Sequence, residues 1–178
     1  MSLAVPASVE FRTGTHVDVP VLVALINSVY RGDSSRLGWT TEADLLDGQR
    51  TDAEEVAALI TAPDSIFLLG ETEAGLLGCM HLERDGDAAW LGMFSIRPGR
   101  QGQGLGRHFL AAAEVEVVSR WRSRVLRMSV ISLRSELIRY YERRGFALTG
   151  ETRPFPTDPR FGIPKVEHLE FAVLEKTL

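Results

Sequence analysis

The stretch Ile96-Arg-Pro-Gly-Arg-Gln-Gly-Gln-Gly-Leu-Gly106 lies between an apolar segment and a segment with helical periodicity. Three of its glycines alternate where the predicted strand passes into the predicted helix. Glycine lets a backbone approach a phosphate closely, and the first N–H groups of a helix point at it with the positive end of the helix dipole. The loop is therefore predicted to bind phosphate. The flanking arginines are Arg97, Arg100 and Arg107.

Two nucleotide-binding loops use similar chemistry with a different spacing. A dinucleotide fingerprint needs Gly-x-Gly-x-x-Gly near the first strand, but here Arg107 stands in place of the third glycine and the unit begins past the middle of the chain. A P-loop needs Gly-Lys-Ser/Thr, and the lysines of this chain are Lys165 and Lys176. Neither nucleotide interpretation fits the spacing, and both are kept only as alternatives to be tested.

The order of predicted elements around the loop indicates a single mixed α/β domain, residues 1–178. Apolar stretches between turn residues predict strands, and apolar residues three or four apart predict helices. Turn signals at 71–75 and 84–87 indicate that three consecutive strands form an antiparallel meander. The predicted elements are a strand at 9–13, a helix after Asp18, further helix starts at Thr41 and Thr51, strands at 66–69, 76–82 and 88–96, a helix at 104–120, a strand at 125–131, a helix at 134–144, and strands at 146–149 and 168–174.

Composition excludes several classes of protein. The 178 residues suffice for one domain with a real core, and no apolar run approaches the roughly 20 residues of a membrane helix. The N-terminus lacks the basic start and apolar stretch of a signal peptide, and the one cysteine, Cys79, cannot form an internal disulfide. We therefore expect a cytoplasmic protein with no membrane partner. The histidines and the cysteine show no metal-ligand spacing, so no metal is expected.

The net charge of −4 is unevenly distributed along the chain. Residues 1–96 carry five arginines and fifteen carboxylates, whereas residues 97–144 carry eleven arginines and four glutamates. A basic middle attracts a polyphosphate, and an acidic first half attracts a cationic amine. Nucleic acid is not an expected partner, because the arginines are not interleaved with aromatic residues and the whole chain is acidic.

Two motifs resemble those of the GNAT superfamily of N-acetyltransferases. Gln101-Gly-x-Gly104-x-Gly106 resembles the family's central coenzyme A motif, and Tyr140-Tyr-Glu-Arg-Arg-Gly-Phe146 resembles its second signature, Tyr-Glu-x-x-Gly-Phe. Both occur in the family's order, separated by one strand, and the order of elements matches over nearly the whole chain. The resemblance implies an α/β (α+β) GNAT fold, with a central mixed, mostly antiparallel sheet of about seven strands flanked by about four helices.

The resemblance implies acetyl-CoA as the co-substrate and places it residue by residue. Family members hold the pyrophosphate on backbone N–H groups of the glycine loop and pair the pantetheine arm with the strand before it. In that arrangement a backbone N–H near Ile96 polarises the thioester carbonyl. Arg134 stands where many relatives carry an asparagine that contacts the coenzyme. The implied coenzyme-binding residues are Phe94, Ser95, Ile96, Gln101, Gly102, Gln103, Gly104, Leu105, Gly106 and Arg107.

The chemistry that the resemblance implies is direct attack of a neutral amine on the thioester. Relatives often protonate the leaving thiolate with the tyrosine before Glu-x-x-Gly-Phe, which is Tyr141, although core packing also suits its helical position. Many relatives place a glutamate early on the strand before the loop as general base, but Ala88-Ala-Trp-Leu91 offers none. His81, Glu83, Glu42 and ordered water are the remaining candidates.

Acetyl transfer from acetyl-CoA to a primary amine of a small molecule or peptide is therefore the expected function, and homodimers are common among relatives. The loop Arg153–Val166 lies where relatives often close the acceptor side. The intact glycine loop and Tyr141 favour an enzyme. The missing strand carboxylate leaves open a catalytically silent acyl-CoA-binding sensor or interaction domain.

Overall fold

The order of helices and strands in a computed structural model of the chain follows the order predicted from hydrophobic periodicity. The structure describes residues 8–38, 41–101 and 104–178. In chain order the elements, with η for 3-10 helices, are β1 (Glu10–Thr13), η1 (His16–Asp18), α1 (Val19–Tyr30), α2 (Gly32–Ser35), β2 (Leu46–Asp47), α3 (Ala53–Thr61), β3 (Ser65–Thr72), β4 (Gly75–Asp85), β5 (Ala88–Ile96), α4 (Leu105–Trp121), β6 (Val125–Ile131), α5 (Ser135–Glu142), β7 (Ala147–Pro154), η2 (Pro159–Phe161), β8 (Ile163–Pro164) and β9 (Glu170–Thr177).

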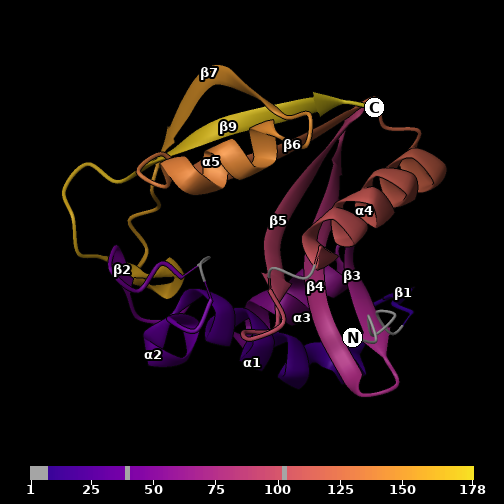
Figure 1. The fold of residues 1–178 in the computed structure, drawn as a ribbon, viewed down its shortest axis with the longest axis horizontal. Helices are drawn as coiled ribbons and strands as arrows, with labels where there is room; N and C mark the ends of the chain where they lie inside the picture. Colours follow the sequence, from indigo (N-terminus) through magenta and orange to yellow (C-terminus); the bar gives the residue numbers. More distant parts are fainter. Residues whose placement is uncertain (1–7, 39–40, 102–103) are drawn as a thin grey trace, which may run out of the picture.

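A seven-stranded sheet forms the centre of the fold, in the order β1-β3-β4-β5-β6-β9-β7 (Figure 1). Neighbouring strands pair antiparallel except β5 and β6, which are parallel. A parallel pair needs a crossover connection, and α4 provides it. The predicted mixed, mostly antiparallel sheet with flanking helices is confirmed.

The two faces of the sheet bury separate clusters of side chains. On one face α4 and α5 pack on the sheet, with Phe109 of α4 fully buried beside Met80 and Leu126. On the other face α1 and α3 cover Phe67 and Cys79. Because successive side chains of a strand point to opposite faces, a strand buried on both faces reads as a continuous apolar run, as the middle of β4 does.

A β-bulge in β5 interrupts this alternation. The register with β4 shifts between Cys79 and His81, where one residue of β4 lies opposite two of β5. At the bulge Met93 has a φ of 48°, a conformation uncommon outside glycine. Leu91 therefore packs on the α4 face while Met93 packs on the α1 face, although the two are only two residues apart.

Strands β5 and β6 separate just before this bulge. Their pairing runs from Ala88 opposite Val125 to Leu91 opposite Met128 and ends there. Strand β6 continues to pair with β9 as far as Ile131. The two strands consequently diverge toward their carboxyl ends (Figure 1), and within the described residues the β6-facing edge of 92–96 has no strand partner.

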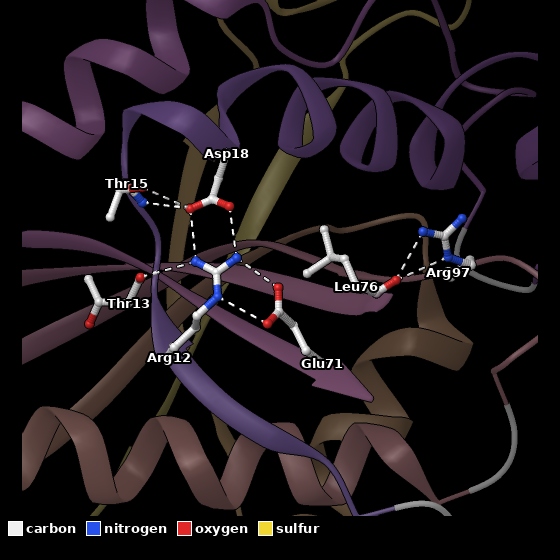
Figure 2. A network of polar contacts seen from close by, with 7 residues as sticks. All are labelled: Arg12, Thr13, Thr15, Asp18, Glu71, Leu76 and Arg97. Carbon is white, nitrogen blue, oxygen red and sulfur yellow. Dashed lines mark hydrogen bonds and ion pairs between the residues drawn. The ribbon is translucent and has the colours of Figure 1, made fainter. Parts of the chain in front are cut away.

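An arginine joins the edge of the sheet to the start of α1 (Figure 2). The Arg12 guanidinium donates to both carboxylate oxygens of Asp18, at 2.9 and 2.8 Å, and to both of Glu71, at 3.1 and 2.7 Å. The backbone N–H of Thr15 also donates to Asp18, at 2.8 Å. The hydrogen bonds from Arg12, followed by those from Thr15, lower the pKa of the Asp18 carboxyl to about 2 despite its burial.

Three details of the chain differ from the sequence predictions. The helix start predicted at Thr41 is wrong: its hydroxyl accepts a backbone N–H at 3.1 Å, but the segment forms turns and Gly48, at φ 80°, cannot continue a helix. Helix α3 begins one residue later than predicted, because Asp52 rather than Thr51 caps it, accepting a backbone N–H at 2.8 Å. The two-residue strands β2 and β8 pair in a second sheet and are too short for any periodicity to predict.

The Asp18 pair gives the first testable prediction. Asp18→Asn should lower the free energy of unfolding at pH 7 by about 1–2 kcal/mol, a value discounted because the Arg12 side chain is 41% exposed. Because the pKa of Asp18 is depressed in the folded state, its contribution is full above the unfolded pKa of about 4 and lost as the pH falls toward 2. About half of the difference between wild type and variant should be gone by pH 3.

Urea unfolding from pH 7 down to pH 3 measures this difference. Asp33→Asn, which removes a fully exposed carboxylate, is the matched control. An unfolding difference that stays constant over this pH range would contradict the assignment.

Candidate acyl-transfer site

The open edge of β5 presents the backbone groups of Phe94 and Ile96. The N–H of Arg97 donates to the Leu77 carbonyl of β4, at 2.8 Å. Because polar groups alternate between the two edges of a strand, those of Ser95 also face β4, while those of Phe94 and Ile96 face the gap beside β6. Phe94, Ser95 and Ile96 were predicted to contact the pantetheine arm, and the backbone groups of Phe94 and Ile96 face the gap. The Ser95 hydroxyl is buried and donates to the Met93 carbonyl, at 3.0 Å.

Side chains contact the two carbonyls on this edge. The Tyr30 hydroxyl, at the end of α1, donates to the Phe94 carbonyl. The Gln101 carboxamide, in the glycine loop, donates to the Ile96 carbonyl at 3.2 Å. These two bonds hold the carbonyls, so the N–H groups of Phe94 and Ile96 remain as the donors that the edge offers to a ligand.

Tyr30 is a site residue that the sequence did not single out. A tyrosine at the end of an amphipathic helix is unremarkable in a sequence, and only the fold brings it to Phe94. Burial, followed by the nearby charge of Glu42, raises the pKa of Tyr30 well above its usual range. The hydroxyl therefore stays protonated and keeps donating.

The glycine loop leads directly into α4. Gly104 is the N-cap residue of this 17-residue helix, with a φ of 76°. Gly106 has no room for a side chain, since a Cβ there would lie 2.0 Å from the Tyr140 hydroxyl of α5. Leu105 points into the core between them. Gly102 and Gln103, which were also predicted to contact the coenzyme, lie outside the described residues.

The arginines near the loop have different surroundings. Arg97 donates twice to the Leu76 carbonyl, at 3.1 and 2.9 Å, and so ties the end of β5 to the start of β4 (Figure 2). Arg107 is exposed in the first turn of α4. Arg144 was not predicted: its guanidinium lies over the Tyr140 ring at 3.3 Å and lines the groove beside the loop. Its position within the second motif was the available signal.

Tyr141 of α5 is buried and its hydroxyl is available. The ring packs edge-on against Tyr140 and Phe146, with centroids 5.3 and 5.8 Å apart. Tyr141 therefore does both things that the sequence allowed: its ring packs in the core, and the residue borders the site. In the described part of the chain the hydroxyl has no hydrogen-bond partner, although it borders two cavities. Burial, and next the proximity of Tyr30, raises the pKa of Tyr141, so the hydroxyl is protonated at neutral pH.

Two cavities meet at Tyr141. A groove of about 260 Å³ runs along the glycine loop and α5, and its walls include six predicted residues. A cavity of about 620 Å³ lies on the other side, bordered by residues from the α1–α3 region, β4 and the loop after β7. The residues that line both are Tyr30, Phe94, Leu137 and Tyr141. The six predicted residues in the groove are Phe94, Ile96, Gln101, Gly104, Gly106 and Tyr141.

The larger cavity contains the predicted base candidates. Glu42 is ion-paired with the buried Arg31, so its carboxylate is engaged. Glu83 is exposed on β4. Phe155 and Phe161, from the predicted acceptor-side loop, also line this cavity.

His81 has a defined protonation state. It lies opposite Gly92 on β5, next to the bulge, where an added Cβ on Gly92 would meet only open space. The Ser65 hydroxyl donates to the Leu59 carbonyl at 2.7 Å, so it accepts from His81 Nε2, also at 2.7 Å. This assignment leaves the lone pair on Nδ1. Burial, with a smaller effect of the Arg50 charge, lowers the pKa of His81 to about 4, so the ring is neutral at pH 7.

Cys79 is not suited to carry an acyl group. Its side chain is fully buried under α1, and burial raises the pKa of its thiol to about 12. A thiolate is the nucleophilic form, so a buried thiol of this kind is inert.

The groove fits acetyl-CoA as a substrate. The dipole at the amino end of α4 favours a pyrophosphate there, beside the glycines of the loop that line the groove. The N–H groups of Phe94 and Ile96 can pair with an extended pantetheine arm. When bound, acetyl-CoA supplies the acetyl thioester. The described residues contain neither a group of three or more potential metal ligands nor a helix long and apolar enough to cross a membrane.

Comparison with known proteins finds one family model that matches part of the chain. Residues 63–148 match the family model of the acetyltransferase (GNAT) domain, and no curated protein sequence matches the chain. Among solved structures, the ribosomal-protein-S18-alanine N-acetyltransferase from Escherichia coli is 16% identical, with a TM-score of 0.69 over 96% of this chain and 94% of that one. Residues 63–148 therefore resemble a GNAT acetyltransferase domain, and the chain shares its fold with this solved structure.

Two further solved structures share the fold. The spermidine/spermine N-acetyltransferase SpeG from Vibrio cholerae is 14% identical, with a TM-score of 0.65 over 95% of this chain and 92% of that one. A GNAT family acetyltransferase from Elizabethkingia anophelis with acetyl-CoA bound is 14% identical, with a TM-score of 0.63 over 96% of this chain and 98% of that one. At these identities the likeness concerns the fold.

The contact between Gly106 and Tyr140 gives the second prediction. Gly106→Ala should weaken acetyl-CoA binding about tenfold, because relieving the clash with the Tyr140 hydroxyl displaces α5 or the loop at a cost of about 1–3 kcal/mol. Adding Tyr140→Phe should restore much of the affinity, since the nearest remaining atom would lie 3.3 Å away. Calorimetric titration of the single and double variants measures both effects. Equal affinity of Gly106→Ala and wild type would contradict this placement of the groove.

Proposed function

We propose that this protein transfers the acetyl group of acetyl-CoA to a primary amine by direct attack in a ternary complex. The observation that carries the proposal is the meeting of two cavities through the gap between β5 and β6. One cavity lies along the glycine loop on the α4–α5 side, and the other opens on the α1–α3 side. A thioester and an amine can thus enter from opposite faces and meet beside Phe94.

Backbone N–H groups would stabilise the thioester carbonyl, and Tyr141 would stabilise the departing sulfur. The N–H groups of Phe94 and Ile96 face the gap, where one would hold the carbonyl oxygen as negative charge develops on it. Tyr141 would give a proton or a hydrogen bond to the departing sulfur. Its raised pKa suits this role, because a protonated hydroxyl is always present to donate. The inert Cys79 supports direct transfer over a covalent acyl-enzyme.

His81 is the proposed acceptor of the amine proton. Its Nδ1 carries a lone pair in a ring that stays neutral above about pH 4, and the space beside Gly92 allows an amine or a water to approach. Glu42 is a weaker candidate because it is ion-paired with Arg31, and Glu83 remains as an alternative on the same face of β4.

The solved neighbours support the donor more than the acceptor. The structure from Elizabethkingia anophelis contains acetyl-CoA, which agrees with the donor proposed here. The proteins from Escherichia coli and Vibrio cholerae are named for a ribosomal-protein alanine and for spermidine/spermine, two different acceptors. Either a small-molecule amine or a peptide amine is compatible with this range.

The third prediction tests Tyr141. Tyr141→Phe should lower kcat about 10²–10⁴-fold while leaving the Kd for acetyl-CoA within about twofold, because only the hydroxyl is lost. Steady-state thiol release over a panel of amines, together with calorimetric binding, measures both quantities. Tyr140→Phe is the matched control on the neighbouring residue.

Two results, one from this experiment and one from thermal unfolding with NADH, ATP or acetyl-CoA, would count against the proposal. If wild type binds acetyl-CoA but releases no thiol with any amine, the chain is a silent acyl-CoA-binding module. If NADH or ATP stabilises the protein thermally and acetyl-CoA does not, the loop binds a nucleotide.

The fourth prediction concerns His81. His81→Gln should reduce kcat at least about tenfold and leave the KM for acetyl-CoA nearly unchanged. Because burial holds the pKa of His81 near 4, its protonation should not limit wild-type kcat/KM between pH 6 and 8. The acid limb should instead move with the pKa of the acceptor amine when acceptors are exchanged. Undiminished turnover by the variant would exclude His81 as the base, whereas a fixed limb near pH 6.5 would contradict its lowered pKa.

A further inference from the structure

Arg50 brings an unneutralised positive charge to the larger cavity. Within the described residues its guanidinium has neither an ion pair nor a hydrogen bond, and its carbon lies over the Tyr30 ring, 5.9 Å from the centroid. A cation–π contact at this distance occupies the face of the guanidinium and leaves its N–H donors free. Those donors form a planar fork that matches an oxyanion.

The backbone at Arg50 is held firmly. The Asn27 side chain, on α1, accepts from the backbone N–H groups of Arg50 and Thr51, at 2.7 and 3.1 Å, and donates to the Thr51 carbonyl at 3.0 Å. Thr51 is fully buried. The arginine therefore projects from a fixed position and does not lie on a loose surface loop.

Several of the other charged side chains that border this cavity have hydrogen-bond or ion-pair partners, whereas Glu83 is exposed at its margin. Arg31 pairs with Glu42, and Arg153 donates to Glu151 at 2.7 Å. Among the carboxylates, Glu55 accepts from the Thr51 hydroxyl at 2.5 Å, and Asp85 accepts from an indole N–H at 3.1 Å. Of the fifteen carboxylates in residues 1–96, four border the cavity, so the acidic charge of the first half of the chain does not make the cavity acidic.

Tyr30 sets the spacing between Arg50 and the reaction centre. Its ring lies under the guanidinium and its hydroxyl donates to the Phe94 carbonyl beside the gap. The Arg50 guanidinium and the Phe94 carbonyl are therefore separated by about the length of one tyrosine side chain. A small molecule with an amine a few bonds from an anionic group spans this separation, whereas a polyamine would bring a second cation against Arg50.

We propose that Arg50 binds an oxyanion of the acceptor, so that the acceptor is a small amine carrying a carboxylate or a chemically similar group. This inference rests on the proposed acetyl transfer and names its substrate class. Acetylation of such an amine forms an amide bond as the thioester bond breaks, the amine proton goes to the base, and the thiolate is protonated.

An anion on Arg50 would also act on His81. Burial lowers the pKa of His81, and the positive charge of Arg50 lowers it further. Neutralising that charge removes the second effect, so the proton affinity of His81 should rise when the acceptor is bound. Acceptor binding and activation of the base are then linked through one arginine.

The fifth prediction tests the substrate class with matched acceptors. For a panel of α- and ω-amino acids, each paired with its carboxamide, wild type should favour the best carboxylate over its carboxamide at least tenfold in kcat/KM for thiol release. Arg50→Gln should bring this ratio close to one, mainly by raising the KM for the carboxylate. Arg50→Lys should retain part of the preference, because it keeps the charge but loses the fork.

Arg153→Gln is the matched control, since it removes an arginine from the same cavity that already has a carboxylate partner. It should preserve the preference. A wild type that favours carboxamides or polyamines, or an Arg50→Gln variant that keeps the wild-type ratio, would overturn the inference while leaving acetyl transfer intact.

Failure of the proposed function would look different, namely acetyl-CoA binding with no thiol release from any amine. In that case calorimetry of N-acetyl amino acids with the CoA-saturated protein still tests Arg50. Binding by wild type that is lost in Arg50→Gln would support the anion site, and no binding by wild type would refute it.

Discussion

The site depends on one backbone constraint, the positive φ of Met93. A non-glycine residue in this region costs of order 1–3 kcal/mol and persists only where its surroundings enforce it. Here the Met93 side chain is buried under α1, and its carbonyl accepts the Ser95 hydroxyl at 3.0 Å. The resulting bulge lies where β5 parts from β6, directly after the last pair at Leu91 and Met128. Without it β5 would continue beside β6, and no backbone N–H would face a ligand.

The electrostatic character of the site follows from burial more than from net charge. Burial raises the pKa of Tyr30 and Tyr141 and lowers that of His81, so three titratable groups around the gap are all uncharged at pH 7. Neutral groups suit a reaction that begins with a neutral amine and a neutral thioester. Two positive charges border the site, Arg50 in the larger cavity and Arg144 in the groove, where the charged parts of two substrates would lie.

The residues proposed for the donor side could be singled out from the sequence because that side depends on local backbone geometry. Alternating glycines before a helix are visible in the sequence itself, and Gly104 and Gly106 lie at the start of α4 and line the groove. The acceptor side joins residues far apart in the chain: Tyr30 reaches Phe94 from α1, and Asn27 positions Arg50. No spacing rule links such pairs. For the same reason β2 and β8 were missed, since each has meaning only as the partner of the other.

Because the two cavities lie on different sides of the sheet, the acceptor of such a protein can change during evolution while its donor stays the same. Helices α1 and α3, with the loop after β7, border the acceptor cavity, whereas α4 and the glycine loop border the groove on the opposite face. Mutations can therefore accumulate on the acceptor side under selection for a new metabolite while the donor side is under purifying selection. Four residues border both cavities, and Tyr30 is the one among them that comes from α1. A substitution at Tyr30 would alter both cavities, so we expect it to be accompanied by a compensating substitution elsewhere in the site more often than other substitutions on α1.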